Sequence, residues 1–159
     1  MAEVTHAAPA GAPVIANAGN KPRTPHKLFV NIPVKDVQAS IRFFEALGFN
    51  FSPQFTDATA TCMPVGQDAY VMMLTKERFA GFSKGKVGDP RDADSHLLTF
   101  SVNSREEVDA MVKKAIAAGG SHHAEPEDHG FMYDWSFRDP DGHGWGVFWM
   151  DPSAIPADA

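Results

Sequence analysis

The chain contains a single cysteine, Cys62, so it cannot form an internal disulfide or a cysteine cluster around zinc. Basic residues are also few: 14 lysines and arginines stand against 20 aspartates and glutamates. The resulting net charge of −6 disfavours nucleic acid and anionic membranes as partners. No stretch approaches the roughly 18 consecutive apolar residues of a membrane span. These absences predict a globular protein that works in the cytoplasm.

The first 26 residues are rich in alanine, proline and glycine and lack a periodic apolar face. Pro9 and Pro13 interrupt every apolar run that could serve as a secretory signal. We therefore predict a disordered tail over residues 1–26, one domain over residues 27–153 and a short tail over residues 154–159. A domain of this size buries most of the surface that its unfolded chain exposes.

The first half of the domain predicts a strand, a helix and three further strands. Residues 28–34 are β-branched and aromatic, as in a strand. Asp36 is a candidate N-cap for the helix, and Gly48 follows the last helical residue. Apolar residues recur between them at helical spacing: Val37, Ile41 and Phe44. The three strand-like runs are residues 50–56, 58–65 and 69–75.

The second half repeats this order. A strand is predicted over residues 96–102, and the helix after it begins with a capping box made by Ser104 and Glu107. Weaker strands follow near "GSHHAE" and "FMYDWSFRD", and the last is "GWGVFWM". The two halves, about residues 27–82 and 96–153, thus predict an α+β fold of two tandem βαβββ modules.

The "VKDVQASIRFFEALGF" opening and the "FRDPDGHGWGVFWMDP" close, together with the repeat, resemble the vicinal oxygen chelate superfamily. This superfamily contains glyoxalase I, bleomycin-resistance proteins and extradiol dioxygenases, and the resemblance is strongest to its lactoylglutathione-lyase-related branch. It implies a curled mixed sheet around a central cleft. It also implies a homodimer.

In metal-dependent members of this superfamily, four strand positions supply histidine, glutamine or glutamate ligands to a divalent ion. Matching the motifs residue by residue places these positions at Phe29, Met73, Leu97 and Gly146. None of the four is a usual ligand of such an ion. A shift of one residue would replace Leu97 by His96, but the shared valine and cap positions favour Leu97. The resemblance therefore predicts that no metal cofactor is bound.

Strand alternation predicts which side chains line the cleft, and Gly146 is expected to enlarge it. The candidate ligand-binding residues are Phe29, Asn31, Met73, Leu97, Thr99, Trp135, Gly146 and Phe148. A cleft with apolar walls and a few polar groups is typical of a small-molecule site. The first hypothesis is a metal-free module that binds a small, largely apolar or aromatic molecule, as the bleomycin-sequestering members do.

The second hypothesis is a glyoxalase-like lyase or isomerase that uses an atypical metal set or metal-free acid–base residues. Its candidate catalytic residues are His129 and Tyr133, with Asp128 as a further partner of His129. The polar segment "SHHAEPEDHG" that contains His129 is predicted as a loop between strands. An alternative metal or acid–base cluster remains open there.

Overall fold

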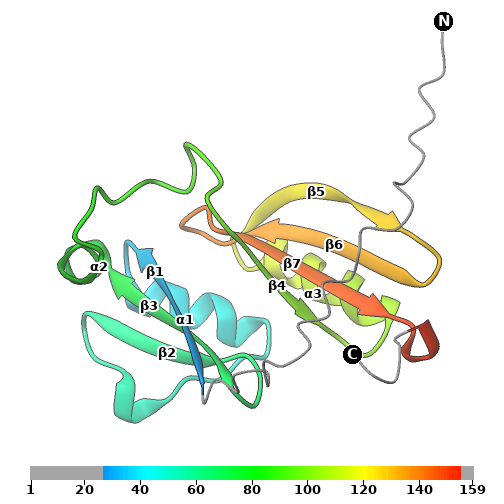
Figure 1. The fold of residues 1–159 in the computed structure, drawn as a ribbon, viewed down its shortest axis with the longest axis horizontal. Coiled ribbons are helices and arrows are strands. Elements are labelled where there is room, and N and C mark those ends of the chain that lie inside the picture. Colours follow the sequence, from blue (N-terminus) through cyan, green and yellow to red (C-terminus); the bar gives the residue numbers. More distant parts are fainter. Residues whose placement is uncertain (1–26, 155–159) are drawn as a thin grey trace, which may run out of the picture.

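The computed structural model describes residues 27–154, which form two β-sheets and three α-helices (Figure 1). The tail predicted for residues 1–26 lies outside the described residues. The elements are β1 (Leu28–Val34), α1 (Val37–Ala46), β2 (Ala60–Pro64), β3 (Ala69–Thr75), α2 (Lys76–Ser83), β4 (Leu97–Ser101), α3 (Arg105–Ala117), β5 (Ser121–Asp128), β6 (Met132–Arg138) and β7 (Gly144–Met150), with two 3₁₀ turns, η1 (Pro53–Phe55) and η2 (Pro152–Ala154). In this part of the chain, no helix is both long and apolar enough to cross a membrane.

The two sheets follow one plan. Sheet one has the strand order β1-β3-β2, and sheet two has the order β4-β7-β6-β5. In each sheet the first strand pairs in parallel with the last strand of its module, and the other pairings are antiparallel. A connection over residues 84–96 joins the two modules. The predicted α+β repeat is therefore confirmed.

The strand predicted over residues 50–56 is wrong, because this segment contains the 3₁₀ turn η1. Pro53 stands at the first position of that turn, where its missing N–H costs nothing, whereas a strand would need the donor. Module one consequently has three strands, whereas module two has four. Helix α2 was not predicted; it begins at Thr75, whose Oγ1 accepts from the Arg78 N–H at 3.4 Å.

Both long helices begin as their sequences predict. The Asp36 carboxylate accepts from two backbone N–H groups of the first turn of α1 at 2.9 and 3.2 Å. At α3, Ser104 Oγ accepts from the Glu107 N–H at 3.2 Å, and the Glu107 carboxylate accepts from the Asn103 N–H at 2.7 Å. These contacts satisfy donors that a helix start otherwise leaves unpaired.

One core joins the two modules. Helix α1 packs against β2 and β3 of sheet one. It also packs against sheet two, where the Phe44 ring lies 4.8 Å from that of Trp145 and the Phe43 ring lies 6.1 Å from that of Phe137. Helix α3 covers the same face of sheet two through Val108. The helices thus cover one face of each sheet and leave the other face open (Figure 1).

The turn between β6 and β7 is anchored by a buried carboxylate. Asp139 is 5% exposed, and its two oxygens accept from the backbone N–H groups of Asp141 and His143 and from Trp145 Nε1, each at 3.0 Å. Burial raises the pKa of Asp139, although the same hydrogen bonds oppose this effect. Gly142 has φ +95°, and a Cβ there would lie 2.5 Å from Arg91 Cγ, so glycine is required.

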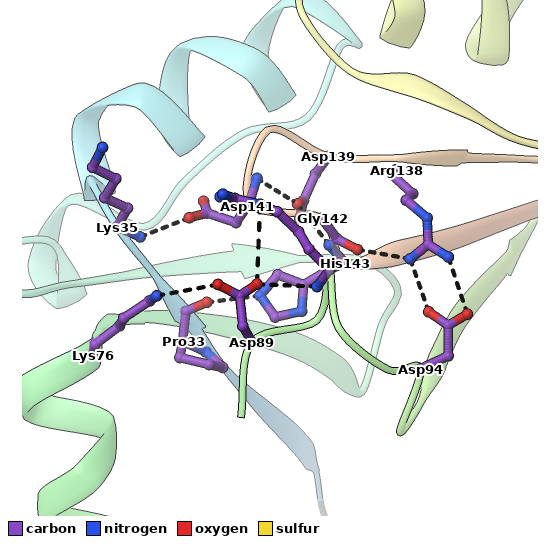
Figure 2. Close-up of polar contacts among 11 residues, drawn as sticks. Pro33, Lys35, Lys76, Asp89, Asp94, Arg138, Asp139, Asp141, Gly142 and His143 are labelled. Carbon is purple, nitrogen blue, oxygen red and sulfur yellow. Dashed lines mark hydrogen bonds and ion pairs between the residues drawn. The ribbon is translucent and has the colours of Figure 1, made fainter. Parts of the chain in front are cut away.

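The same turn holds the modules together (Figure 2). His143 Nε2 donates to the Pro33 carbonyl at 2.7 Å, and the Lys35 N–H donates to Asp141 Oδ1 at 2.8 Å. Both acceptor–donor pairs connect the end of β1 in module one with the turn of module two. The Asp-Pro-Asp-Gly-His turn, residues 139–143, therefore links the two modules through hydrogen bonds.

Candidate functional site

The open face of sheet two carries the side chains that can meet a ligand. The parallel register pairs Leu97 with Gly144 and Thr99 with Gly146. The antiparallel register adds Ser136 opposite Gly146 on the other side of β7. Because paired residues point to one face of a sheet, these residues share the face opposite to α3.

A cavity of about 480 Å³ lies on this face, and we name it the sheet-two pocket. It is lined by Leu97, Thr99, His123, Ala124, Met132, Asp134, Trp135, Ser136, Gly146, Phe148 and Met150. Most of these side chains are apolar, and Asp134 is the only carboxylate among them. Such a lining suits a small molecule with a mainly apolar surface.

Gly146 does not enlarge this pocket as the sequence suggested. A Cβ built on it would lie 2.7 Å from Thr99 Oγ1 and 3.1 Å from Thr99 Cγ2. The threonine side chain therefore occupies the space over the glycine. From the sequence, we expected Gly146 to enlarge the cleft for a ligand. In the structure, the absence of a side chain at Gly146 makes room for the Thr99 side chain.

Five of the eight predicted ligand-binding residues line the pocket, and the register places four of them on its face of the sheet: Leu97, Thr99, Gly146 and Phe148. Trp135 borders it as well, but the register pairs Trp135 with Val147 on the helix-facing side of the sheet. Its Nε1 donates to the Ala124 carbonyl at 2.8 Å. Phe148 is thus the aromatic side chain that the register directs to the pocket face.

The three residues predicted from module one lie elsewhere. Phe29 stacks on Tyr70 with ring centroids 4.8 Å apart and is 48% exposed. Asn31 lines a different cavity. Met73 is fully buried in the core and pairs with Ile32, so the cleft-facing position predicted for it is wrong. Its neighbour Met72 is the residue that pairs with Asn31.

Two further cavities lie next to both modules. One, of about 490 Å³, lies under the connection between the modules and includes Asn31, Asp89, His96 and His143. Burial lowers the pKa of His96 there, and the nearby His143 acts in the same direction. The other, of about 280 Å³, lies between β1, β3 and β4 and is almost wholly apolar.

The two catalytic candidates lie on opposite sides of sheet two. The Tyr133 hydroxyl donates to Asp109 Oδ1 of α3 at 2.7 Å, and burial together with this bond raises the pKa of Tyr133 to about 12. His129 Nε2 lies 3.2 Å from Asp134 Oδ2 at the pocket. Among the described residues, no hydrogen bond joins His129 to Tyr133 or Asp128, and Asp128 forms an ion pair with Arg105 at 2.7 Å.

The sequence prediction missed a polar contact in the pocket lining, between His123 and Ser136. Strand β5 confirms the weak strand predicted near "GSHHAE" and extends it to Asp128, where a loop was predicted. On this strand, His123 Nδ1 lies 3.1 Å from Ser136 Oγ. The other ring nitrogen lies 3.7 Å from Asp94 Oδ2. Irregular pairing between β5 and β6 brings His123 into reach, which no sequence period reveals.

The positions that hold a metal in the superfamily carry no suitable donors. Leu97, Gly146 and Phe29 offer no ligand atom, and Met73 is in the core. Over residues 27–154, no group of three or more histidine, cysteine, aspartate or glutamate side chains could hold a metal ion. The residues present therefore do not fit a divalent ion.

Comparisons with known proteins agree with the fold. The family model "Glyoxalase/Bleomycin resistance protein/Dioxygenase superfamily" matches residues 27–147, and the chain belongs to that superfamily. The hypothetical protein SA1046 from S. aureus is 28% identical, with a TM-score of 0.68 over 80% of this chain and 95% of its own. No curated protein matches the chain.

Two other solved structures share the fold. A glyoxalase/bleomycin resistance protein/dioxygenase family enzyme from Burkholderia phytofirmans is 24% identical, with a TM-score of 0.64 over 77% of this chain and 96% of its own. A bleomycin resistance determinant encoded on the transposon Tn5 is 18% identical, with a TM-score of 0.55 over 79% and 98%. At these identities the likeness concerns the fold alone.

Proposed function

We propose that this protein binds a small, largely apolar or aromatic molecule in the sheet-two pocket without a metal ion. The observation that carries the proposal is the lining of this 480 Å³ pocket. Leu97, Met132, Phe148 and Met150 supply apolar walls, and the superfamily's ligand positions in the same sheet are occupied by Leu97 and Gly146. Burial of apolar surface, at roughly 25 cal/mol per Å², then supplies the binding free energy.

Phe148 gives the pocket a preference for flat molecules. Aromatic rings attract one another in offset or edge-to-face arrangements worth roughly 0.5–1.5 kcal/mol beyond area burial. The two methionines, Met132 and Met150, pair with one another at the end of the same face and adapt easily to a ligand's shape. We therefore expect planar aromatic compounds to bind better than aliphatic ones of equal size.

We also propose that the chain acts as a homodimer. Leu28 and Phe29 are each about half exposed on strand β1. A second copy can cover such apolar side chains through a two-fold contact. The superfamily resemblance supports the same assembly.

Calorimetric titration with naphthalene derivatives tests the binding proposal. Phe148→Ala should weaken binding by about 5-fold or more, because it removes the aromatic wall. Phe82→Ala is the matched control, since Phe82 is 68% exposed on α2 and is not part of the pocket lining. Equal affinity in wild type and Phe148→Ala would show that the ligand binds elsewhere.

Metal independence is tested separately. Elemental analysis of the purified protein should find no stoichiometric divalent metal, and zinc or nickel should leave the thermal midpoint unchanged. Gly146→Glu should not create a site, because one carboxylate leaves the other three positions without donors. Tight binding of a divalent ion by either protein would overturn the proposal.

A second function is favoured by one contact. His129 and the pocket residue Asp134 are close enough for proton transfer, as a metal-free lyase or isomerase of the glyoxalase type would require. Turnover of methylglyoxal with glutathione that is lost in Asp134→Asn, but kept in the exposed control Glu125→Gln, would establish this function. No turnover in wild type would exclude glyoxalase activity.

A further inference from the structure

The polar atoms of the sheet-two pocket gather around Ser136. This serine lies on the pocket face of β6, directly opposite Gly146. Its Oγ is 3.1 Å from Nδ1 of His123, whose side chain is only 21% exposed. Gly146, its partner on β7, places no side chain beside Ser136, and the Thr99 side chain of β4 lies over the glycine.

The other side of the His123 ring faces a fixed negative charge. Asp94 Oδ2 lies 3.7 Å from His123 Nε2, and both Asp94 oxygens accept from the Arg138 guanidinium, at 2.8 and 3.0 Å. These hydrogen bonds hold the pKa of Asp94 below its usual range, so the carboxylate stays ionised. A carboxylate beside Nε2 favours the imidazole tautomer that carries its proton on that nitrogen.

This tautomer sets the direction of the next hydrogen bond. Nδ1 of His123 then has a free lone pair, and the Ser136 hydroxyl donates its hydrogen to it. The lone pairs of Ser136 Oγ consequently face the pocket as acceptors. A ligand that covers Ser136 should present a donor to these lone pairs, because an acceptor that loses water without gaining a partner is costly.

The charges of the lining narrow the ligand class. No lysine or arginine belongs to the pocket lining, and its one carboxylate, Asp134, is accompanied by His129. An anionic ligand would therefore be buried without a counter-charge, which is strongly unfavourable. A hydroxyl on a flat ring satisfies the serine without adding charge, and its oxygen can also accept from the Thr99 hydroxyl beside Gly146.

We propose that Ser136, oriented by His123, determines specificity in the sheet-two pocket by accepting a hydrogen bond from the neutral hydroxyl of a planar aromatic ligand. This inference rests on the proposed binding function. It assigns Ser136 a contact with the ligand, and it makes His123 a positioning residue that acts through Ser136.

Three probes of similar shape test the assignment by calorimetry at pH 7: 2-naphthol, 2-methoxynaphthalene and 2-naphthoate. Wild type should bind the naphthol about 3- to 10-fold more tightly than its methyl ether, as expected for one neutral hydrogen bond. The naphthoate should bind at least about 10-fold more weakly than the naphthol, because its charge has no partner.

Substitutions separate the serine from the pocket as a whole. Ser136→Ala should remove the preference for naphthol while leaving the affinity for the methyl ether within about 2-fold. Ser83→Ala is the matched control, since this exposed serine lies on helix α2 and outside the pocket lining. His123→Gln should reduce the preference, and nitrogen NMR should find the His123 proton on Nε2 in wild type.

The outcomes distinguish this inference from the function on which it depends. If naphthol and methyl ether bind equally well to wild type, or if naphthoate binds most tightly, the role of Ser136 is wrong and the pocket proposal stands. If no probe binds, the pocket proposal itself fails. If a serine-directed fluorophosphonate labels Ser136 covalently, Ser136 acts as a nucleophile, and the proposed role as a hydrogen-bond acceptor is wrong.

Discussion

Replacing Gly146 by alanine should destabilise the protein although the strand itself would favour the change. In a strand interior, alanine is better than glycine by roughly 0.5–1 kcal/mol, because glycine loses more backbone entropy on folding. At this position the new methyl group would meet three atoms of Thr99. They lie 2.7 Å (Oγ1), 3.1 Å (Cγ2) and 3.3 Å (Cβ) from it, all closer than ordinary van der Waals contact.

The magnitude follows from how little Thr99 can move. Rotation about χ1 exchanges Oγ1 and Cγ2 but leaves Cβ in place, and β-branched side chains have few alternative rotamers. Overpacking of this kind typically costs about 1–3 kcal/mol. After the gain from alanine is subtracted, we expect Gly146→Ala to lower the free energy of unfolding by about 0.5–2 kcal/mol.

A double-mutant cycle isolates the contact. In Thr99→Ala the two nearest atoms are absent, so adding Gly146→Ala should be neutral or slightly stabilising, which gives a coupling of at least about 1 kcal/mol. Urea unfolding followed by tryptophan fluorescence and circular dichroism measures all four proteins. Gly81→Ala is the control, because a Cβ there meets open space on helix α2 and should stabilise by about 0.5–1 kcal/mol.

Two results would refute the reasoning. Gly146→Ala could be as stable as wild type, which would mean that Thr99 does not occupy the space over the glycine. Alternatively, the cost could be the same with threonine or alanine at position 99, in which case another neighbour causes it. Either result would reopen Gly146 as a position that enlarges the pocket.

Three further predictions concern the ionisation of Tyr133, the hydrogen bond between Lys35 and Asp141 that links the modules, and the proposed homodimer. Burial and Asp109 raise the pKa of Tyr133 to about 12, whereas tyrosine in the unfolded chain titrates near about 10. The stability that Tyr133 contributes should therefore be lost as the pH rises from about 10 to about 12. Urea unfolding should show this loss in wild type and not in Tyr133→Phe. Asp141→Ala should lower the free energy of unfolding by about 1 kcal/mol in thermal melts, because the Lys35 N–H loses its acceptor. Asp141→Asn keeps an acceptor oxygen and should cost less. Equal losses in the two variants would show that this hydrogen bond contributes nothing to stability. Light scattering should give about twice the chain mass of 17.3 kDa, and Phe29→Asp should halve it; a monomeric wild type would contradict the dimer.

The local features of this fold could be predicted from the sequence because their causes are local. Asp36 and the Ser104–Glu107 pair start their helices through contacts within one turn, so short motifs are enough to find them. The repeat of strands and helices gave the α+β class for the same reason. Proline at position 53 is also a local signal against a strand, and the structure has a 3₁₀ turn there.

The sequence also determined which atoms the site could not contain. The side chains of glycine and leucine contain no metal-binding atom in any fold. The sequence alone therefore excludes side-chain metal ligands at Gly146 and Leu97. Alternation within one strand likewise placed Leu97 and Thr99 on a common face. These conclusions depend on residue identity and on a period of two, and neither requires a partner strand.

Only the tertiary structure decided how the strands face one another. Alternation alone does not say which set of side chains meets the helices, and a slip of one residue inverts the answer, as it did for Met73. The contact between His123 and Ser136 joins two strands across an irregular pairing, and Thr99 fills the space over Gly146 from a neighbouring strand. Such contacts depend on register and packing between segments distant in the chain, which a linear pattern of residues does not specify.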